Sequence, residues 1–540
     1  MKMKKTALQG ILGLVIGLVA AGTMTFAGEA EKMGEGETTL YKDMFDQAAY
    51  SEGMNQLDLG RWGRRITHKT IPSADINIFD EVPDSSFFTN RHARQKMSAA
   101  ELEKGPHQTD GPDLSKPLTV LGAEQQGSHY GFVVEDAKKD QYILRFDPQG
   151  AAELNTAAEV IGARFYHALG YNVPQTTILS FAADQLTAAP DAITCDNTGF
   201  AKKLTQTLLQ QYLLFVPLPQ GTYRASASKV PAGGDAGTFS FMGRGKKNPQ
   251  DIVNHRDLRE IRALGVFAAW LNHHEMLESN TRDAAVTENG KTVLKHYLTD
   301  FTNALGAATD GAKEPMFGYE HMVDYGETFK SILGLGFWES PWQKKWKRAG
   351  EKTISPAVGY FSNDLFDPAK YKNLLPYEAF RLVTRADGFW AAKSMMSFSD
   401  EDIRAMVRAG KYGRSEDEDY IVKTLSERRD IIAKYWFSRV SPLDQFVFSG
   451  TELSFKDLAV AYGFVPREGT LYRTEVVSGK KKITVLETAE PVVKLQPEWL
   501  AGNSAIKLVI RTLRPSSKKA DPSVTVLLNA SGVQGIRHED

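Results

Sequence analysis

The centre of the sequence carries three side chains whose types and spacing suit phosphoryl transfer. Glu275 follows two histidines at the end of an apolar helical pattern, Asn280 comes five residues later, and Asp300 follows a predicted hairpin. In phosphoryl transfer one carboxylate orients the attacking hydroxyl, while an amide oxygen and a second carboxylate hold magnesium against the phosphates. The spacing therefore predicts Glu275 as the catalytic carboxylate, and Asn280 with Asp300 as metal ligands.

Each of these residues also has an ordinary structural interpretation. Asn280 would then cap the backbone of its own loop, Asp300 would be a surface carboxylate, and Glu275 would be a solvated charge. His273 and His274 raise a further hypothesis, a zinc hydrolase. However, adjacent residues do not share a helix face, and no third ligand follows at a recognised spacing. We favour the magnesium hypothesis.

A positive charge in a strand could face the phosphates from the other side. Arg145 lies in a strand predicted from Tyr142 to Phe146, and Glu159 lies in a helix predicted from Ala151 to Leu169. Arginine binds phosphate in a bidentate fashion, and a helix carboxylate would hold it in place. We expect Arg145 and Glu159 to approach to salt-bridge distance. A strand arginine paired with a helix glutamate, with no nucleotide, is the simpler alternative.

Three glycines lie between the first two predicted strands and form a candidate nucleotide-binding loop. They are Gly122, Gly127 and Gly131. Glycine lets backbone N–H groups approach a phosphate. Loops between strands often contain glycine, however, and this spacing matches no strict glycine fingerprint. The glycines therefore count as candidates only together with Arg145.

The elements around these residues change in type along the chain. Strand patterns begin at Leu118, enclose one helix, and continue to Lys229. A second helix leads to His273, and Asn289-Gly290 predicts the hairpin that ends at Asp300. Residues 315–440 are expected to be mostly helical, with Trp338, Trp342 and Trp346 on one helix face. From about residue 450 the pattern returns to strands.

The amino terminus has the features of a secretory signal peptide. A basic start at residues 1–5 precedes an apolar stretch that ends in Thr25-Phe26-Ala27, which offers small residues at the positions that a signal peptidase reads. We expect cleavage near Gly28, export to the periplasm or beyond, and no stable membrane span afterwards. A retained membrane anchor is the alternative.

Composition excludes some classes of protein. Without the three lysines of the leader, the chain has 62 basic and 66 acidic residues, a formal charge of −4. This near-balance argues against a nucleic-acid binder. Hydrophobic residues make up 42% and charged residues 24% of the chain, as in ordinary folded proteins. Cys195 is the single cysteine, so no intramolecular disulfide forms. A length of 540 residues favours two or three domains.

These motifs resemble those of the protein-kinase-like superfamily, especially its atypical members such as toxin kinases of persistence modules, spore-coat kinases and secretory-pathway kinases. The segments 82–86, 142–148, 269–273 and 298–301 are also similar to a family of exported bacterial kinase-like proteins. The resemblance implies an α+β fold with two kinase-like lobes, a β-rich N-lobe and a helical C-lobe, plus a small C-terminal β domain.

The resemblance also implies roles for the candidate residues. Asn280 and Asp300 would bind Mg²⁺ or Mn²⁺ together with ATP or another nucleotide, Glu275 would be the base, and Arg145 with Glu159 the ion pair. Arginine stands where these kinases have lysine, and Glu275 where they have aspartate. An active phosphotransferase and a pseudokinase scaffold that binds an envelope partner therefore both stay open.

The implied organisation has five parts. In order they are a signal peptide (1–27), an irregular N-terminal extension wrapping the core (28–117), a kinase-like N-lobe (118–245), a kinase-like helical C-lobe (246–445) and a small β domain (446–540). Expected partners are a nucleotide and an envelope acceptor, which would be a protein, a sugar or a small hydroxyl compound. The sequence predicts no oligomeric state.

Overall fold

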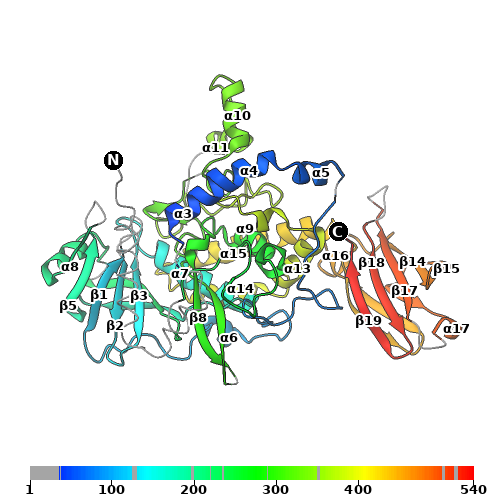
Figure 1. The fold of residues 1–540 in the computed structure, drawn as a ribbon, viewed down its shortest axis with the longest axis horizontal. Coiled ribbons are helices and arrows are strands. Elements are labelled where there is room, and N and C mark those ends of the chain that lie inside the picture. Colours follow the sequence, from blue (N-terminus) through cyan, green and yellow to red (C-terminus); the bar gives the residue numbers. More distant parts are fainter. Residues whose placement is uncertain are drawn as a thin grey trace.

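The computed structural model describes residues 36, 38–67, 69–124, 131–195, 200–218, 221–233, 236–288, 290–314, 316–349, 353–500, 505–515 and 521–539. The chain forms a mixed α+β structure. A large sheet lies at one end, helices lie in the middle, and a second group of strands lies at the other end (Figure 1). The predicted signal peptide lies outside the described residues.

The large sheet has seven strands in the order β4-β7-β3-β2-β1-β5-β6. They are β1 (Leu118–Glu124), β2 (Gly131–Glu135), β3 (Gln141–Phe146), β4 (Thr176–Phe181), β5 (Leu186–Cys195), β6 (Ala201–Lys203) and β7 (Tyr223–Lys229). The sequence predicted five of these strands, while β5 and β6 were missed. Along β3 the residues alternate between buried and half-buried, because successive side chains point to opposite faces of a sheet. Leu144 and Phe146 enter one apolar core, and Arg145 points to the other face.

The second face of this sheet is covered by α7 (Leu154–Leu169), which is buried along almost its whole length. The helix begins three residues later than predicted, since the Asp147 carboxylate accepts hydrogen bonds from the backbone N–H groups of Asn155 and Thr156. It ends at Gly170, as predicted, with a φ of +126°. A Cβ at Gly170 would lie 2.3 Å from the ring of Phe88, so only glycine fits there.

The central helices share the largest apolar core with α7. They are α9 (Arg259–Leu271), α12 (Glu378–Arg381), α13 (Arg385–Met395), α14 (Asp400–Arg408) and α15 (Ser415–Phe437). Trp270 of α9 is fully buried, and its indole N–H donates to the Leu425 carbonyl of α15. The predicted capping box of Ser399 and Asp402 is present at the start of α14.

Two sequence predictions about helices are wrong. Trp338 does not share a helix with Trp342 and Trp346, because α10 (Tyr325–Leu333) ends before it and α11 (Pro341–Ala349) begins after it. Proline favours the first position of a helix and cannot lie in its interior. In addition, no helix forms in the described part of residues 350–377, where we expected mostly helix.

The N-terminal extension is not irregular throughout. Residues 40–67 form α3 (Leu40–Met44), η2 (Phe45–Ser51), α4 (Glu52–Leu57) and α5 (Leu59–Thr67), and α6 (Ala99–Lys104) follows later. Three glycines at 53, 60 and 63 lower the helix propensity and obscured the pattern. Only α6 was predicted, from the capping box that Ser98 and Glu101 form.

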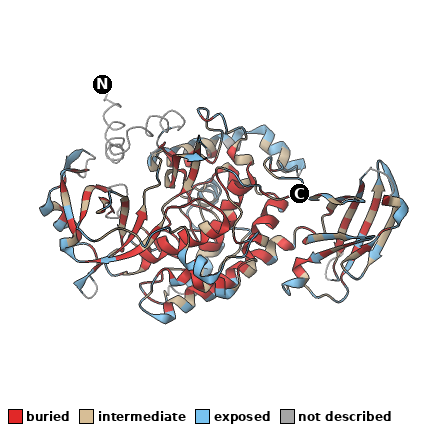
Figure 2. Ribbon diagram, turned by 90° about the horizontal axis from the view of Figure 1, so that it is seen from below, coloured by how far each residue is buried: buried red, intermediate tan, exposed pale blue. Residues whose placement is uncertain are grey.

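The C-terminal strands surround an apolar core of their own (Figure 2). One sheet contains β12 (Leu443–Ser449), β13 (Glu452–Asp457) and β16 (Val492–Lys494); the other contains β14 (Leu471–Ser478), β15 (Lys481–Thr488), β17 (Ile506–Leu513), β18 (Val524–Asn529) and β19 (Gly532–His538). The short helices α16 (Leu458–Ala461) and α17 (Pro497–Leu500) join them. The sequence predicted β14, β15, β17 and β18.

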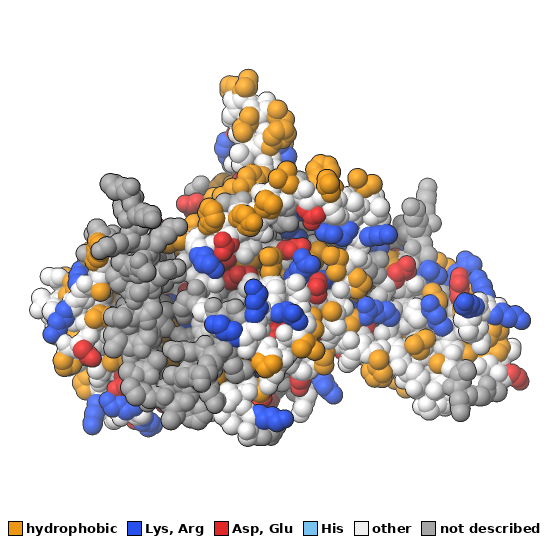
Figure 3. Space-filling view, in the orientation of Figure 1, with side chains coloured by type: hydrophobic (Ala, Val, Ile, Leu, Met, Phe, Trp, Pro, Cys, Tyr) orange, Lys and Arg blue, Asp and Glu red, His pale blue; other side chains and the backbone are white. Residues whose placement is uncertain are grey.

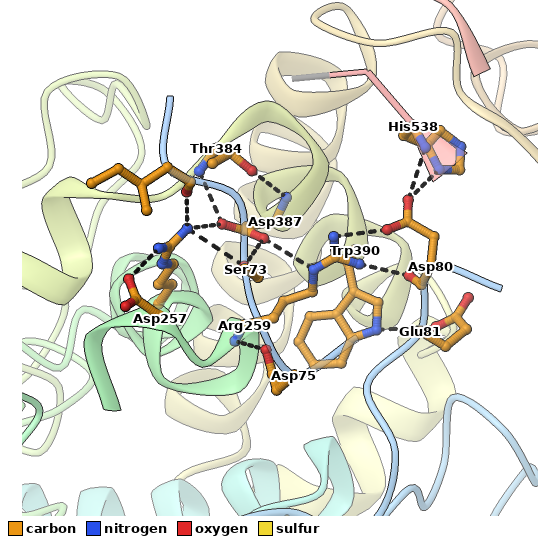
Figure 4. Close-up of polar contacts among 12 residues, drawn as sticks. Ser73, Asp75, Asp80, Glu81, Asp257, Arg259, Thr384, Asp387, Trp390 and His538 are labelled. Carbon is orange, nitrogen blue, oxygen red and sulfur yellow. Dashed lines mark hydrogen bonds and ion pairs between the residues drawn. The ribbon is translucent and has the colours of Figure 1, made fainter. Parts of the chain in front are cut away.

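A buried ion network joins β19 to α9 and α13 (Figure 4). Asp80 pairs with Arg259 at 2.9 Å and with His538 at 2.8 Å, and Arg259 also lies 3.0 Å from Asp387. Burial disfavours the charged form of Asp80, but hydrogen bonds from His538 and the charge of Arg259 hold its pKa well below the usual range. This network fixes four segments that are far apart in the sequence.

The structure also bears on membrane crossing. None of the helices built from described residues combines the length and the apolar character that a bilayer span requires.

Candidate active site

The candidate site lies where β3, α7 and the end of a hairpin meet. Arg145 of β3 has one guanidinium nitrogen 3.9 Å from Oε1 of Glu159 and another 3.3 Å from Oδ2 of Asp300. All three side chains are largely shielded from solvent, with exposed fractions of 12%, 1% and 22%. The expected approach of Arg145 and Glu159 is therefore observed, and Asp300 joins them.

Glu159 is held by hydrogen bonds from two further segments. The Ser228 hydroxyl of β7 donates to its Oε1 at 2.9 Å, and the backbone N–H of Phe301 donates to its Oε2 at 2.5 Å. Burial raises the pKa of Glu159 to about 7, opposed by Arg145 and reinforced by the charge of Asp300. A proton or a cation near these two carboxylates is therefore favoured.

The turn that carries Asp300 packs directly on α7. Asp300 has a φ of +60°, which is uncommon for a residue other than glycine. Phe301 follows it and is fully buried against α7. At Gly162 of α7 a Cβ would lie 2.5 Å from the Cβ of Phe301. A glycine at 162 thus allows the close approach that places Asp300 beside Arg145.

The loop with the other candidates begins where α9 ends. Asn272 ends the helix in a left-handed conformation, so the backbone changes direction before His273. The loop leads to β8 (Thr281–Glu288), which pairs with β9 (Lys291–Leu298) and forms the predicted hairpin. Thr281 pairs with Leu298, so Asn280 and Asp300 leave the same end of the hairpin. The backbone N–H of Thr299 also donates to the Asn280 carbonyl at 3.0 Å.

Asn280 braces the loop through its amide nitrogen. Its Nδ2 donates to the backbone carbonyl of Glu275 at 3.1 Å. This is the local cap that the structural interpretation expected, yet it uses the nitrogen and not the oxygen that a magnesium ion would take. The capping role and the metal-binding role are therefore compatible in one side chain.

Glu275 lies in a setting that favours its protonated form. The Nδ2 of Asn303 donates to its Oε2 at 2.7 Å, and its side chain is 21% exposed. Burial raises the pKa of Glu275 to about 7, and the charge of Asp300 adds to this effect. A carboxylate with a pKa near neutrality is suited to accept a proton.

The two histidines pack in the interior. Nδ1 of His273 lies 3.2 Å from the Tyr166 hydroxyl, and the His274 ring stacks on Phe317 with centroids 4.3 Å apart. Burial lowers the pKa of His273 to about 4 and that of His274 well below its usual value. Among the described residues, no group of three or more His, Cys, Asp or Glu is arranged to hold a metal. A magnesium ion here would need phosphate oxygens and water to complete its coordination.

The candidate glycines lie in different places. Gly122 is part of β1, where the register with β2 shifts, and so it does not lie between strands as predicted. Gly131 begins β2 and pairs with Arg145 of β3. Gly127 lies outside the described residues. The strand β1 continues to Glu124 because its backbone pairs with both β2 and β5.

Four residues that support the site were missed by sequence reasoning. Tyr166 contacts His273, Asn303 holds Glu275, Ser228 holds Glu159, and Gly162 admits Phe301. Only Asn303 carried a usable signal, as an amide three residues after Asp300. The other three act through contacts between distant segments.

Comparisons with known proteins add one distant likeness. No family model and no curated protein matches the sequence. Among solved structures, the proinflammatory kinase CtkA of Helicobacter pylori is similar over 57% of this chain and 94% of that chain, with a TM-score of 0.26 and 10% identity. A likeness at this level carries no argument about function, which must rest on the geometry of the site.

Proposed function

We propose that the chain is an exported, kinase-like protein that binds a nucleotide with Mg²⁺ or Mn²⁺ and transfers a phosphoryl group to a hydroxyl acceptor. The acceptor would be an envelope protein, a sugar or a small hydroxyl compound. The observation that carries the proposal is the contact of Arg145 with both Glu159 and Asp300. It joins a strand, a helix and a hairpin end in the order that a kinase-like site requires.

The charges around Arg145 fit a bound metal–nucleotide pair. Two carboxylates, Glu159 and Asp300, lie on either side of one guanidinium. A divalent ion would neutralise the phosphates and the Asp300 carboxylate, and the Arg145 guanidinium would bind phosphate oxygens. Asn280 would supply its amide oxygen to the same ion. Gly131, directly opposite Arg145 in the sheet, leaves the strand without a side chain at that position.

Glu275 supplies the proton chemistry in this proposal. Its pKa near 7 lets the carboxylate accept the proton of an acceptor hydroxyl at neutral pH. The hydrogen bond from Asn303 fixes one carboxylate oxygen, so the other oxygen remains for the hydroxyl. Asn280 holds the backbone of Glu275 and thereby couples the base to the metal ligand.

A pseudokinase scaffold is the second candidate, and one observation favours it. Asp300 lies 3.3 Å from Arg145, so a cation already neutralises the carboxylate that would bind the metal. In a pseudokinase this ion pair would be permanent. The protein would then bind an envelope partner, and the strands of residues 446–540 would be the natural place for that partner.

The remaining parts of the proposal concern organisation and location. Residues 118–245 and 246–445 would be the two lobes, and residues 446–540 a separate β domain, consistent with the separate apolar cores around their strands. Residues 1–27 would direct export and be removed. N-terminal sequencing of the protein isolated from its cell tests the export step: a mature start near Gly28 supports it, and Met1 contradicts it.

One experiment distinguishes the two candidates. Thermal shift of the isolated protein is measured with ATP, GTP and other nucleotides, each with Mg²⁺, with Mn²⁺ and with EDTA. A phosphotransferase gives a shift that requires the divalent ion and disappears in Asp300→Asn. Its Glu275→Gln variant keeps the shift but loses nucleotide turnover. Absence of any shift at millimolar nucleotide would make the scaffold the better candidate.

A further inference from the structure

The molecule exposes a large apolar surface that no folding argument explains. It comprises two groups of side chains, one on α3 to α5 and one on α10, α11 and the turn between them. The members are Tyr41, Phe45, Tyr50, Met54, Leu57, Leu59, Trp62 and Ile66, together with Phe329, Ile332, Leu333, Leu335, Phe337 and Trp338. We name this set the apolar ridge.

The exposure of the ridge is far beyond that of scattered surface residues. Phe337 is 89% exposed, and Leu335 and Leu59 are each 85% exposed. The two groups lie on one side of the molecule: α3 to α5 run along it, and α10 with α11 projects from it (Figures 1 and 3). Contiguous exposed apolar patches mark sites of interaction.

Basic residues accompany the α5 and α10–α11 parts of the ridge along the chain. Residues 57–69 and 325–349 contain nine Lys and Arg against three Asp and Glu, although the whole chain has a formal charge of −1. In the sequence of α5, Trp62 lies between Arg61 and Arg64, and α11 carries Lys344 and Lys345 between Trp342 and Trp346. The net charge of the two segments is thus strongly positive while their apolar side chains face outward.

This combination matches one kind of partner. Helices that mix Lys and Arg with Trp, Phe and Leu lie in the plane of a lipid–water interface. Their apolar side chains enter the acyl boundary, and their basic side chains meet anionic headgroups. The α10–α11 part of the ridge is also a projection and not a groove (Figures 1 and 3). A projection can insert into a fluid surface, whereas a folded protein partner would need a complementary hollow.

We infer that the apolar ridge docks this protein on an anionic phospholipid surface, with α5 and α10–α11 as two points of attachment. The helices lie in the interface and do not cross it, in keeping with their lengths of nine residues each. The inference is independent of phosphoryl transfer, because it uses no residue of the candidate active site.

Vesicle co-sedimentation tests the inference. The protein, as isolated from the cells that make it, is mixed with vesicles of phosphatidylcholine alone or of phosphatidylcholine with phosphatidylglycerol. We expect binding that rises with the anionic lipid and falls with added salt. The double variant Leu333→Glu/Phe337→Glu should lower the bound-to-free ratio by at least about tenfold. Leu214→Glu, at a site 73% exposed on the large-sheet side, is the matched control and should bind as the unchanged protein does.

A charge variant separates the two contributions. Lys344→Glu/Lys345→Glu should lower the ratio by about tenfold and weaken its salt dependence. Lys480→Glu/Lys481→Glu, at the exposed start of β15 in the C-terminal sheet, should leave both unchanged. Equal binding to neutral and anionic vesicles, or binding unaffected by either ridge variant, would overturn the inference. A dimer that light scattering detects without lipid, and that Leu333→Glu/Phe337→Glu dissociates, would also overturn the inference. A second copy of the chain would then cover the ridge.

Discussion

The Arg145 guanidinium lies 3.3 Å from the Asp300 carboxylate and 3.9 Å from that of Glu159. One cation therefore serves two carboxylates, and these come from segments about 140 residues apart in the sequence. Burial raises the pKa of Glu159 to about 7, an effect that the charge of Arg145 opposes and the charge of Asp300 reinforces. Two neighbouring carboxylates favour added positive charge, and a divalent ion would meet this demand.

Removal of the Asp300 charge tests that demand. Asp300→Asn keeps a side chain that tolerates the positive φ at this position, so the turn should survive. We expect the Mg²⁺-dependent thermal shift with nucleotide to disappear. Asp310→Asn, an exposed aspartate ten residues later, is the control and should retain the shift. Retention of the shift in both variants would place the metal elsewhere.

The charge of Arg145 should matter more than its shape. Arg145→Lys keeps a cation between Glu159 and Asp300, so nucleotide affinity should stay within about threefold and turnover should persist. Arg145→Met leaves the buried Glu159 without its cation, and affinity should fall by about tenfold or more. Isothermal titration with Mg²⁺ and nucleotide measures the nucleotide affinity of both variants. Arg473→Met, at an exposed strand position, should change nothing. Equal losses in the lysine and methionine variants would mean that the guanidinium geometry is essential.

Glu275 gives a pH-dependent stability prediction. Its pKa of about 7 in the folded protein exceeds the ordinary value of 4.5, so the folded state holds a proton that the unfolded state releases. That contribution is present at low pH and is lost as the pH rises through about 7. Glu275→Gln cannot ionise. The variant should therefore gain stability relative to the unchanged protein as the pH rises. This gain in the free energy of unfolding should be larger at pH 8 than at pH 5 by on the order of 1–3 kcal/mol.

Denaturant unfolding at both pH values measures this difference. The control is Glu314→Gln, at an exposed position, for which the difference between the two pH values should vanish. If Glu275→Gln has the same effect at pH 5 and at pH 8, the side chain is not held in a protonation-sensitive setting, and its assignment as a base loses its support.

The sequence predicted those parts of the site that depend on local order. A strand followed by a helix brings Arg145 near Glu159, and the pairing of β8 with β9 brings Asp300 back beside the start of β8. The sequence could not predict the supporting contacts, because Ser228 reaches Glu159 only through the pairing of β7 with β3. The same limit applies to α3 to α5, whose apolar side chains are exposed and therefore follow no burial pattern.

Gly162 shows how such a contact can be tested. Alanine there would place a methyl group 2.5 Å from the Cβ of Phe301, and neither backbone can retreat because α7 is buried. Gly162→Ala should lower the free energy of unfolding by about 1–3 kcal/mol and weaken nucleotide binding by displacing Asp300. Gly53→Ala, in a helix where a Cβ meets nothing within 4 Å, should be neutral or slightly stabilising. Similar effects in the two variants would mean that helix propensity, and not the contact with Phe301, decides the outcome.

The network of Figure 4 allows a prediction about how the C-terminal strands are fixed. Asp80 accepts hydrogen bonds from the backbone and the ring of His538 and pairs with Arg259, which is 2% exposed. Asp80→Asn keeps the shape of the side chain and tolerates the φ of +63° at this position. The Arg259 guanidinium then loses one of its two carboxylate partners and keeps its ion pair with Asp387. The free energy of unfolding should fall by about 2–4 kcal/mol at pH 7.

The pH dependence of that loss identifies its cause. The pKa of Asp80 is depressed in the folded protein, so its contribution is present above the unfolded pKa near 4 and is lost as the pH falls. The difference between Asp80→Asn and the unchanged protein should therefore shrink as the pH is lowered from 7 toward 3. Asp84→Asn, at an exposed site four residues on, should cost far less at pH 7. A cost for Asp80→Asn that stays constant down to pH 3 would show that shape, and not charge, holds β19 against the rest of the protein.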